Sequence, residues 1–340
     1  MNFKEYIEVH RKAIYSRICE YIPLKEPVEH YKIVREYSDR QGSYRRPALL
    51  MLSGQMFGAK PEELVLPAAA MQLSEDWILI HDDIEDHSDM RRGKPTLHKI
   101  YGAEISINAG DAAHMAMWKM ANDYVAKVGI EKGKRFFDKF YKILEHTVEG
   151  QYLEDNFIYN VRDLSRASEE LYYKIIDAKT CCYTVYGPMQ LGAIVAGQPD
   201  STLETLEHIT KPAGRAFQIV DDVLDMTADE KVFGKKRYGD LYEGKITLMV
   251  LHAYSKAAEN ERAELNRIYG KDREQKTKNE IEYIVGMIQK YKSLEYAQNE
   301  AAKYREQARQ AVEQRMKDLP NNEYTPIMMS AMGELSVRHK

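Results

Sequence analysis

Apolar residues recur at spacings of three and four along nearly the whole sequence. One stretch shows the pattern clearly, with apolar side chains at Leu66, Ala69, Ala70, Leu73, Trp77, Ile80 and Ile84. This period places one face of an α-helix against a core, whereas the strict alternation that marks half-buried strands is scarce. The sequence therefore predicts an all-α protein.

Proline and glycine, the residues that interrupt helices, are few. The 340 residues contain 11 prolines and 19 glycines, spaced to leave room for roughly ten or more helices. The predicted breaks are Gln41-Gly42, Pro61, Gly93-Lys94-Pro95, Gly129, Gly187-Pro188, Gly197-Gln198-Pro199 and Leu319-Pro320. No linker rich in serine, glycine or proline divides the chain, so we expect residues 1–340 to form a single domain.

Two aspartate-rich segments indicate a metal site: Asp82-Asp83-Ile84-Glu85-Asp86 and Asp221-Asp222-Val223-Leu224-Asp225. Residues four apart on a helix share a face, with Cβ atoms about 5–6 Å apart, so each segment presents an acidic edge. Carboxylates without histidine or cysteine partners favour Mg²⁺, which keeps waters and takes phosphate oxygens from a substrate. Opposed across a cavity, the two edges would hold a magnesium-bound diphosphate.

Each aspartate cluster is followed by a basic stretch that contains glycine. Arg91-Arg92-Gly93-Lys94 follows the first cluster, at the helix end or in the next turn, and residues 234–245 follow the second. Either stretch alone would be interpreted as solvated surface, because charged residues are mostly exposed. Placed after both clusters, such cations are suited to neutralise a leaving diphosphate. One ion contact at 4 Å is worth roughly 4 kcal/mol of attraction at an effective dielectric of about 20, before the cost of desolvation is subtracted. Cleavage of a carbon–oxygen bond assisted in this way needs no covalent nucleophile.

Composition excludes several other classes of protein. The net charge is −4, from 49 basic and 53 acidic residues spread over the whole length, so nucleic acid is not an expected partner. Three cysteines suggest no disulfide framework and fit a reducing cytoplasm. No uninterrupted apolar run is long enough to span a membrane, and no signal peptide is recognised at the N-terminus. The sequence also lacks Ser-His-Asp, P-loop, dinucleotide-binding and zinc-protease signatures.

Further motifs complete an ordered series: Gly42 to Pro47, the first aspartate cluster with its Arg-Arg-Gly-Lys-Pro-Thr, Gly110-Asp111, Gly150-Gln151, Lys179-Thr180, Phe217 to Asp222, Gly239-Asp240-Leu241 and Lys245 to Leu248. Over nearly the whole chain this series resembles the trans-isoprenyl diphosphate synthases, or polyprenyl synthases. The resemblance implies an isoprenoid-synthase-type helical bundle around a central cavity, and a homodimer. It also implies a prenyltransferase that joins an allylic diphosphate to isopentenyl diphosphate, head to tail.

The resemblance also implies roles for individual residues. Two to three Mg²⁺ ions would be bound by Asp82, Asp86 and Asp221, with support from Asp83, Asp222 and Asp225. The allylic diphosphate would be held by Arg91, Lys179, Lys235 and Lys245. Thr180 and Gln218 would lie beside the developing carbocation and, with Lys179, form the catalytic set.

The acceptor half of the site departs from the family pattern. The family holds the acceptor diphosphate with a lysine, two arginines and a histidine or glutamine; Arg46 and Arg92 match the arginines, but Ser43 and Glu75 replace the other two. A carboxylate beside a diphosphate is repulsive unless a cation intervenes. Three explanations are open. Arg45 supplies the missing positive charge, or Glu75 pairs with one of the arginines and preserves a rearranged pocket, or the enzyme uses a different acceptor.

Product length is set, by the same resemblance, in the turns before the first aspartate cluster. Trp77 lies about 7.5 Å along the helix from Asp82 by rise alone, and it is bulky enough to form the floor of the cavity. Ile78 and Ser74 share the face of Asp82 more nearly, and Ser74 is small. We expect a C15 to C20 product and favour C20, geranylgeranyl diphosphate, over farnesyl diphosphate.

Two alternative functions stay open. The altered acceptor positions Ser43 and Glu75 are also compatible with an enzyme that ionises an allylic diphosphate but uses another acceptor, or that catalyses a terpene-cyclase-like reaction. A non-catalytic regulatory subunit of a synthase is the second alternative, and the intact aspartate clusters argue against it.

Overall fold

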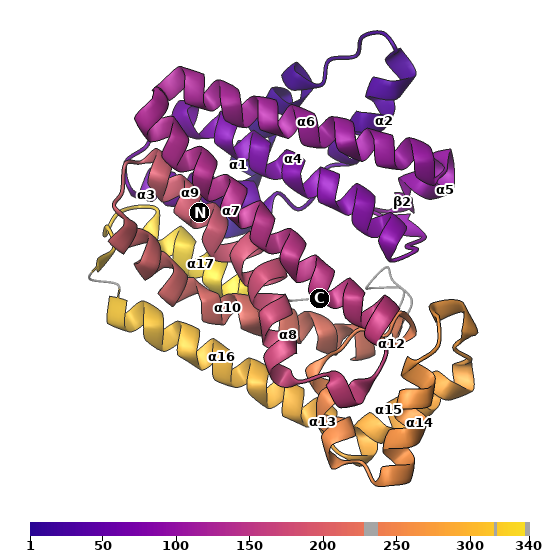
Figure 1. Ribbon diagram of the computed structural model, residues 1–340. Helices are drawn as coiled ribbons and strands as arrows, with labels where there is room; N and C mark the ends of the chain where they lie inside the picture. Colours follow the sequence, from indigo (N-terminus) through magenta and orange to yellow (C-terminus); the bar gives the residue numbers. More distant parts are fainter. Residues whose placement is uncertain (228–236, 316–317, 337–340) are drawn as a thin grey trace. The chain divides into compact units, whose positions relative to one another are not determined.

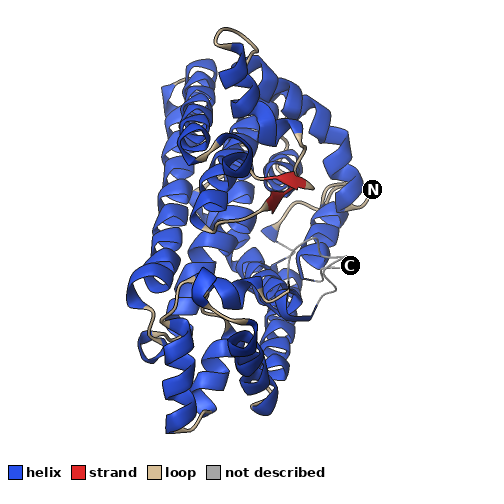
Figure 2. Ribbon diagram, turned by 90° about the vertical axis from the view of Figure 1, so that its right-hand side faces the viewer, coloured by secondary structure: helices blue, strands red, loops and turns tan. Residues whose placement is uncertain are grey.

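The computed structural model describes residues 1–227, 237–315 and 318–336. Within these ranges the chain is almost wholly helical, with more than ten α-helices and one short hairpin as its only strands (Figures 1 and 2). The prediction of an all-α, isoprenoid-synthase-type fold is confirmed. The contacts divide the chain into two compact units, which are described separately. The single domain and the central cavity stay predictions.

The first unit contains residues 1–142, 184–207 and 316–331. Its elements are α1 (Phe3–Tyr21), α2 (Val28–Asp39), α3 (Arg45–Met56), α4 (Pro61–Glu85), β1 (Met90–Arg91), β2 (Lys94–Pro95), α5 (Leu97–Tyr101), α6 (Ala103–Val128), the start of α7 (Ile130–Asp155) and α9 (Gly187–Val195). The long helices α4 and α6 pack along one another (Figure 1).

Helix α3 forms the centre of this unit because glycines let its neighbours approach closely. All residues of α3 from Pro47 to Met56 are buried, as is the whole of α9. A Cβ at Gly192 of α9 would lie 2.0 Å from the backbone oxygen of Leu50. A Cβ at Gly54 of α3 would lie 2.3 Å from a methyl carbon of Leu64 in α4. Both contacts exclude a side chain at the glycine, so these helices pack with their backbones close together.

The second unit contains residues 143–183, 208–315 and 332–340. Its elements are the end of α7, the π-helical segment η1 (Asn156–Val161), the 3₁₀ turns η2 (Leu164–Arg166) and η4 (Arg273–Gln275), and the helices α8 (Glu169–Ile176), α10 (Asp200–Thr227, from residue 208), α12 (Gly239–Glu243), α13 (Leu248–Lys256), α14 (Glu259–Tyr269), α15 (Lys278–Lys290) and α16 (Ser293–Arg315). A second π-helical segment, η3 (Asp177–Tyr186), and α17 (Thr325–Ser336) each have residues in both units. Apolar side chains of α8, α10, α13 and α15 form one buried cluster.

Most predicted breaks coincide with element ends, but one does not interrupt the helix. Pro61 is the first residue of α4, and Gly129 separates α6 from α7 with a φ of +88°, a conformation that favours glycine. The break predicted at Gly187-Pro188 is wrong: η3 runs directly into α9, and the helix only changes from π to α there. Pro188 is the second residue of α9, directly after the change from π to α.

Candidate active site

The first aspartate cluster lies at the carboxyl end of α4. Asp82 and Asp83 belong to the last turn of the helix, and Asp86 is the residue that caps it. The backbone N–H of Asp86 donates to the carbonyl oxygen of Asp82 at 2.8 Å, so the chain still makes a full turn between them. The predicted acidic edge of Asp82 and Asp86 therefore has the expected spacing, although Asp86 is not inside the helix.

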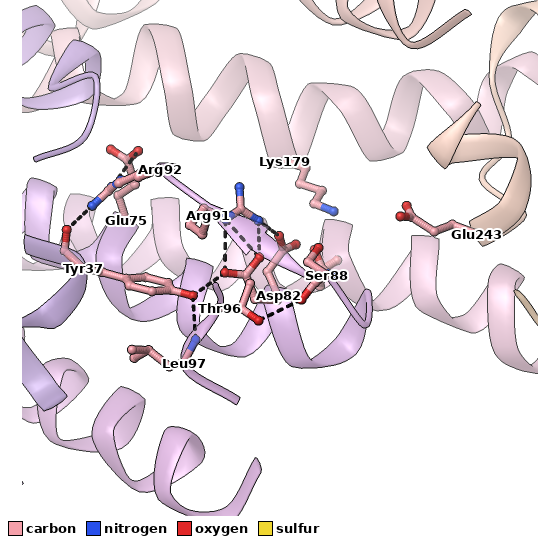
Figure 3. A network of polar contacts seen from close by, with 12 residues as sticks. Tyr37, Glu75, Asp82, Ser88, Arg91, Arg92, Thr96, Leu97, Lys179 and Glu243 are labelled. Carbon is pink, nitrogen blue, oxygen red and sulfur yellow. Dashed lines mark hydrogen bonds and ion pairs between the residues drawn. The ribbon is translucent and has the colours of Figure 1, made fainter. Parts of the chain in front are cut away.

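Asp83 holds Arg91 in place. The side chain of Asp83 is fully buried, and the Arg91 Nε donates to its two oxygens at 2.9 and 3.1 Å. Arg91 Nη2 donates to Asp83 and also reaches Asp82 Oδ2 at 3.4 Å (Figure 3). Burial lowers the pKa of Arg91, but the hydrogen bonds and charge of Asp83 outweigh burial and raise it overall. Asp83 is thus placed to orient the arginine beside Asp82.

Tyr37 of α2 completes the support of Asp83. Its hydroxyl donates to Asp83 Oδ2 and accepts from the backbone N–H of Leu97 at 3.3 Å (Figure 3). Burial first, and then the charge of Asp83, raises the pKa of the Tyr37 phenol, so the hydroxyl keeps its proton. All oxygens of this buried carboxylate therefore have partners, as buried charges require.

A tight turn sends two adjacent arginines to different partners. Strands β1 and β2 pair Met90 with Pro95 and Arg91 with Lys94, which leaves Arg92 and Gly93 as the two turn residues. Their φ angles are +52° and +77°, as a type I′ hairpin turn requires. Arg91 points to Asp82 and Asp83, whereas Arg92 points to Glu75 and to the carbonyl oxygen of Tyr37 (Figure 3).

The two matched acceptor arginines both contact Glu75. Arg46 Nη1 lies 3.2 Å from Glu75 Oε2, and Arg92 Nη2 lies 3.6 Å from Glu75 Oε1. Arg92 Nη2 also lies 2.9 Å from Asp76, whose carboxylate accepts a hydrogen bond from Ser38 at 2.6 Å. Ser43, at the position of the family's lysine, is exposed. An ion pair of Glu75 with one of the arginines is one of the alternatives that the sequence leaves open, and in the structure Glu75 contacts both arginines.

The residues predicted to set product length lie on α4 as expected. Ser74 is buried and donates from Oγ to the carbonyl oxygen of Met71 at 2.7 Å, while Trp77 and Ile78 are half-buried. The Trp77 ring stacks on His114 of α6, with centroids 4.1 Å apart. Trp118 donates from Nε1 to His114 Nε2 at 2.8 Å. Trp77 is therefore fixed in an aromatic column that joins α4 to α6.

In the second unit, Thr180 and Gln218 form one hydrogen-bonded chain with Asp222. Thr180 Oγ1 donates to Gln218 Oε1 at 2.7 Å, and Gln218 Nε2 donates to Asp222 Oδ1 at 2.8 Å. Tyr172 donates to the other oxygen of Asp222 at 2.8 Å. Burial raises the pKa of Asp222 well above its usual range, and the nearby Asp240 raises it further. The structure thus brings together three of the predicted residues through side chains.

Two of the lysines predicted for the second unit form ion pairs with acidic neighbours. Lys179 forms an ion pair with Glu154, and Lys245 forms one with Glu243 at 2.7 Å. Asp225 accepts a hydrogen bond from the backbone N–H of Asp240 at 3.3 Å. Asp221 lies on the same helix, α10, one residue before Asp222. Lys235 lies outside the described residues.

The donor chemistry of the first cluster suits a hard cation. Across the described ranges, no group of three or more His, Cys, Asp or Glu side chains is placed to hold a metal ion. Asp82 and Asp86 offer only oxygen ligands, which fits Mg²⁺, an ion that keeps several waters and completes its shell with substrate phosphate oxygens. An edge of two carboxylates is therefore sufficient for this ion, provided that the substrate contributes the other ligands.

A family model, polyprenyl synthetase, matches residues 28–288. The geranylgeranyl diphosphate synthase of Methanosarcina mazei is 32% identical over 315 residues, which cover 92% of each chain. The chain belongs to the polyprenyl synthetase family. A relative from Natronomonas pharaonis, named geranylfarnesyl diphosphate synthase, is 32% identical and covers 73% of this chain and 75% of its own.

A solved structure supports the family at the level of the fold. The geranylgeranyl pyrophosphate synthetase of Pyrococcus horikoshii has a TM-score of 0.85 and 29% identity, over 99% of this chain and 98% of its own. The polyprenyl synthetase relatives confirm the predicted resemblance and the predicted class, a prenyltransferase. Within the described ranges, no helix is both long and apolar enough to cross a membrane.

Several partners of the predicted residues were not predicted from the sequence: Tyr37 and Asp76 in the first unit, and Glu154, Tyr172 and Glu243 in the second. Asp76 gave a usable signal, because an acid inside the apolar run of α4 must find a buried partner. The tyrosines gave none, since they are two among 24. The acidic partners of the lysines follow from tertiary contacts that no local pattern records.

Proposed function

We propose that this protein is a Mg²⁺-dependent, short-chain prenyltransferase that condenses an allylic diphosphate with isopentenyl diphosphate. The observation that carries the proposal is the family match over residues 28–288, together with relatives named as geranylgeranyl diphosphate synthases. In this reaction the allylic carbon–oxygen bond breaks, diphosphate leaves, a carbon–carbon bond forms with the alkene of the acceptor, and one proton passes to the departed diphosphate. No step needs a protein nucleophile.

We assign the metal to the aspartates: Asp82 and Asp86 in one cluster and Asp221 in the other, with Asp83, Asp222 and Asp225 in support. The oxygen-only donors of Asp82 and Asp86 favour this assignment. Two to three bound Mg²⁺ ions would neutralise charge on the leaving diphosphate. The contacts of Asp83 with Arg91 and of Asp222 with Gln218 give both supporting residues a positioning role.

We assign the allylic diphosphate to Arg91, Lys179, Lys235 and Lys245. Arg91 is aimed by Asp83, and Lys179 and Lys245 each keep an acidic partner that a bound diphosphate would replace. Thr180 and Gln218 would lie beside the allylic cation, where their linked oxygens stabilise positive charge. This stabilisation is electrostatic and pre-organised, because Gln218 is held by Asp222, which is itself held by Tyr172.

Product length is proposed to follow from Trp77. Its ring is locked by His114, so the floor it provides would not move aside for a longer chain. Ser74 and Ile78 occupy the neighbouring turns of α4. We propose a C15 to C20 product and favour C20, geranylgeranyl diphosphate.

We also propose that the protein is a cytoplasmic homodimer. Several large apolar side chains of α6 and of the first half of α7 are exposed: Ile105, Ile107, Met115, Ile130 and Tyr141. Association with another chain would remove such side chains from water, which is favourable. A second copy of the chain is the partner that the family resemblance implies.

The decisive experiment is product analysis by mass spectrometry. The purified protein is incubated with Mg²⁺ and dimethylallyl, geranyl, farnesyl or geranylgeranyl diphosphate, with and without isopentenyl diphosphate, and released diphosphate is measured in parallel. We expect C15 or C20 diphosphate only when isopentenyl diphosphate is present, and we expect Asp82→Ala or Asp221→Ala to abolish it. No turnover with any allylic substrate would contradict the proposal and favour a regulatory subunit.

One structural observation favours a second function. Glu75 contacts both arginines proposed for the acceptor, Arg46 and Arg92. An enzyme that ionises the allylic diphosphate and then uses another acceptor, or cyclises the cation, would tolerate this arrangement. Diphosphate release that does not depend on isopentenyl diphosphate would support this second function over chain elongation.

A further inference from the structure

The pocket that contains Arg46 and Arg92 already holds an anion of its own. The carboxylate of Glu75 is largely buried, with 9% of its side chain exposed, and places one oxygen against each arginine. The distances are 3.2 Å to Arg46 and 3.6 Å to Arg92. Glu75 thus bridges the two guanidinium groups in the way that a bound phosphate group would.

A second acid removes the positive charge that remains. Asp76, next to Glu75 on α4, is completely buried and lies 2.9 Å from Arg92. Two arginines therefore meet two carboxylates, and this set carries no net charge. A diphosphate that enters the pocket gains attraction from the arginines but is repelled by both acids, and in a partly buried site that repulsion is weakly screened.

The two acids differ in how firmly they are held. Asp76 accepts hydrogen bonds from Ser38 at 2.6 Å and from Gln72 at 3.2 Å, so its carboxylate is fixed. Asp76 also lies 2.9 Å from Arg92 Nη2. Within the described residues, Glu75 Oε2 lies 3.2 Å from Arg46 but accepts no hydrogen bond. Glu75 is therefore the less firmly held acid and the one that a ligand can displace.

We propose that Glu75 is a built-in counter-anion of the acceptor site. It holds Arg46 and Arg92 while the site lacks an acceptor, and it opposes the diphosphate group of isopentenyl diphosphate when that acceptor arrives. Glu75 is then a specificity-determining residue that weakens acceptor binding and leaves allylic diphosphate binding unaffected. This inference rests on the proposed function for the identity of the acceptor.

Calorimetric titration with isopentenyl diphosphate alone, in the presence of Mg²⁺, tests the inference without turnover, because no allylic substrate is present. Wild type is compared with Glu75→Gln, which keeps the shape and removes the charge, and with Glu75→His. We expect both variants to bind isopentenyl diphosphate at least about tenfold more tightly. Glu62→Gln, an exposed glutamate near the start of the same helix, is the matched control and leaves the affinity unchanged.

A steady-state readout separates the acceptor from the donor. In the elongation assay, Glu75→Gln is expected to lower the KM for isopentenyl diphosphate by a similar factor and to change the KM for the allylic diphosphate by less than about twofold. A parallel fall in both KM values would overturn the inference, because it would show a general change in charge rather than an effect on the acceptor.

Unchanged or weaker binding of isopentenyl diphosphate by folded Glu75→Gln overturns the inference. If that variant does not fold, Glu75→Asp decides, because it keeps the charge but withdraws it by one methylene group; binding no tighter than wild type then has the same meaning. A wild-type protein that fails to elongate contradicts the proposed function, whereas the affinity ratio of variant to wild type still decides the role of Glu75.

Discussion

Asp76 shows how a single buried charge constrains its neighbours. It is completely buried, and burial raises the pKa of its carboxyl despite the charge of Arg92. Removal of one partner from a buried ion pair leaves the other uncompensated, at a cost of about 3–5 kcal/mol. We expect Asp76→Ala to lower the free energy of unfolding by this amount, measured by urea denaturation.

An exposed ion pair provides the control for Asp76. Asp138 on α7 pairs with Lys134 one turn away, and 57% of its side chain is exposed. Such surface pairs contribute about 0–1 kcal/mol, so Asp138→Ala should change stability by no more than that. Equal effects of the two substitutions would contradict the assignment of Asp76 as a buried, essential counter-charge.

Lys276 predicts a pH dependence of stability. Its Nζ donates to the carbonyl oxygens of Leu241 and Tyr242 at the end of α12, and burial lowers the pKa of Lys276 from 10.5 to about 8. Between these two pH values the unfolded chain binds more protons than the folded one, so stability contributed by this group rises with pH. We expect wild type to gain about 3 kcal/mol relative to Lys276→Met as pH rises from about 8 to about 10.5.

Unfolding by denaturant at several pH values measures that difference. The contributions of all ionisable groups that both proteins share cancel in it. Lys278→Met, at a lysine whose side chain is 83% exposed, serves as the control and should show no such change. A pH-independent difference between wild type and Lys276→Met would rule out burial of the amine.

At the scale of elements, the hairpin between α4 and α5 depends on Gly93. Its φ of +77° is strained for any residue with a Cβ, although no atom lies within 4 Å of the place where a Cβ would be. Gly93→Ala should therefore cost about 1–2 kcal/mol through the backbone alone. The same change at Gly286, inside α15 and equally open, should stabilise by about 0.5–1 kcal/mol.

Thermal unfolding of the two variants measures both effects. We expect the change in stability to have opposite signs for Gly93→Ala and Gly286→Ala. Both sites have room for a Cβ, and they differ only in backbone conformation. A stabilising Gly93→Ala would show that the turn is not left-handed. If Arg91 holds the allylic diphosphate, as we propose, binding of that substrate should weaken in the Gly93 variant only.

Helices could be predicted from the sequence because their signal is local and repeated. The period of α4, with Pro61 at its start, is recorded in the order of its own side chains. The hairpin at Met90–Pro95 was not predicted because two-residue strands are too short to show alternation. The π-helical segments were missed for a different reason: their hydrogen-bond pattern depends on packing against other helices.

At the scale of the whole molecule, the exposed apolar residues on α6 predict a dimer. Met115 is 73% exposed, and Ile105 lies on the same helix. We expect wild type to sediment at twice its mass of 39.4 kDa, and Met115→Glu to sediment as a monomer because a buried charge without a partner opposes association. Leu24→Glu, at an exposed leucine between α1 and α2, is the control and should stay dimeric. A monomeric wild type, or a dimeric Met115 variant, would contradict this interface.

The family and its fold could be predicted from the whole chain because the motifs are specific in kind and order. The ion pairs within the site could not. Glu75 was identified as a departure from the family pattern, but its contact with two arginines requires α3, α4 and the hairpin to be in place. Several side chains of opposite charge could reach Glu75, and the sequence does not distinguish between them. Which of them form the ion pair is decided by the tertiary structure.

The guanidinium group of Arg92, in the hairpin, lies where a side chain at residue 42 would otherwise be. A Cβ at Gly42 would lie 2.4 Å from Arg92 Nη2, so the guanidinium group fits only because residue 42 has no side chain. To engineer a new acceptor specificity, the charge at Ser43 and Glu75 can therefore be changed, but no side chain can be added at Gly42. A library that randomises this pocket should keep glycine there, because any larger residue displaces the arginine that the other substitutions are meant to tune.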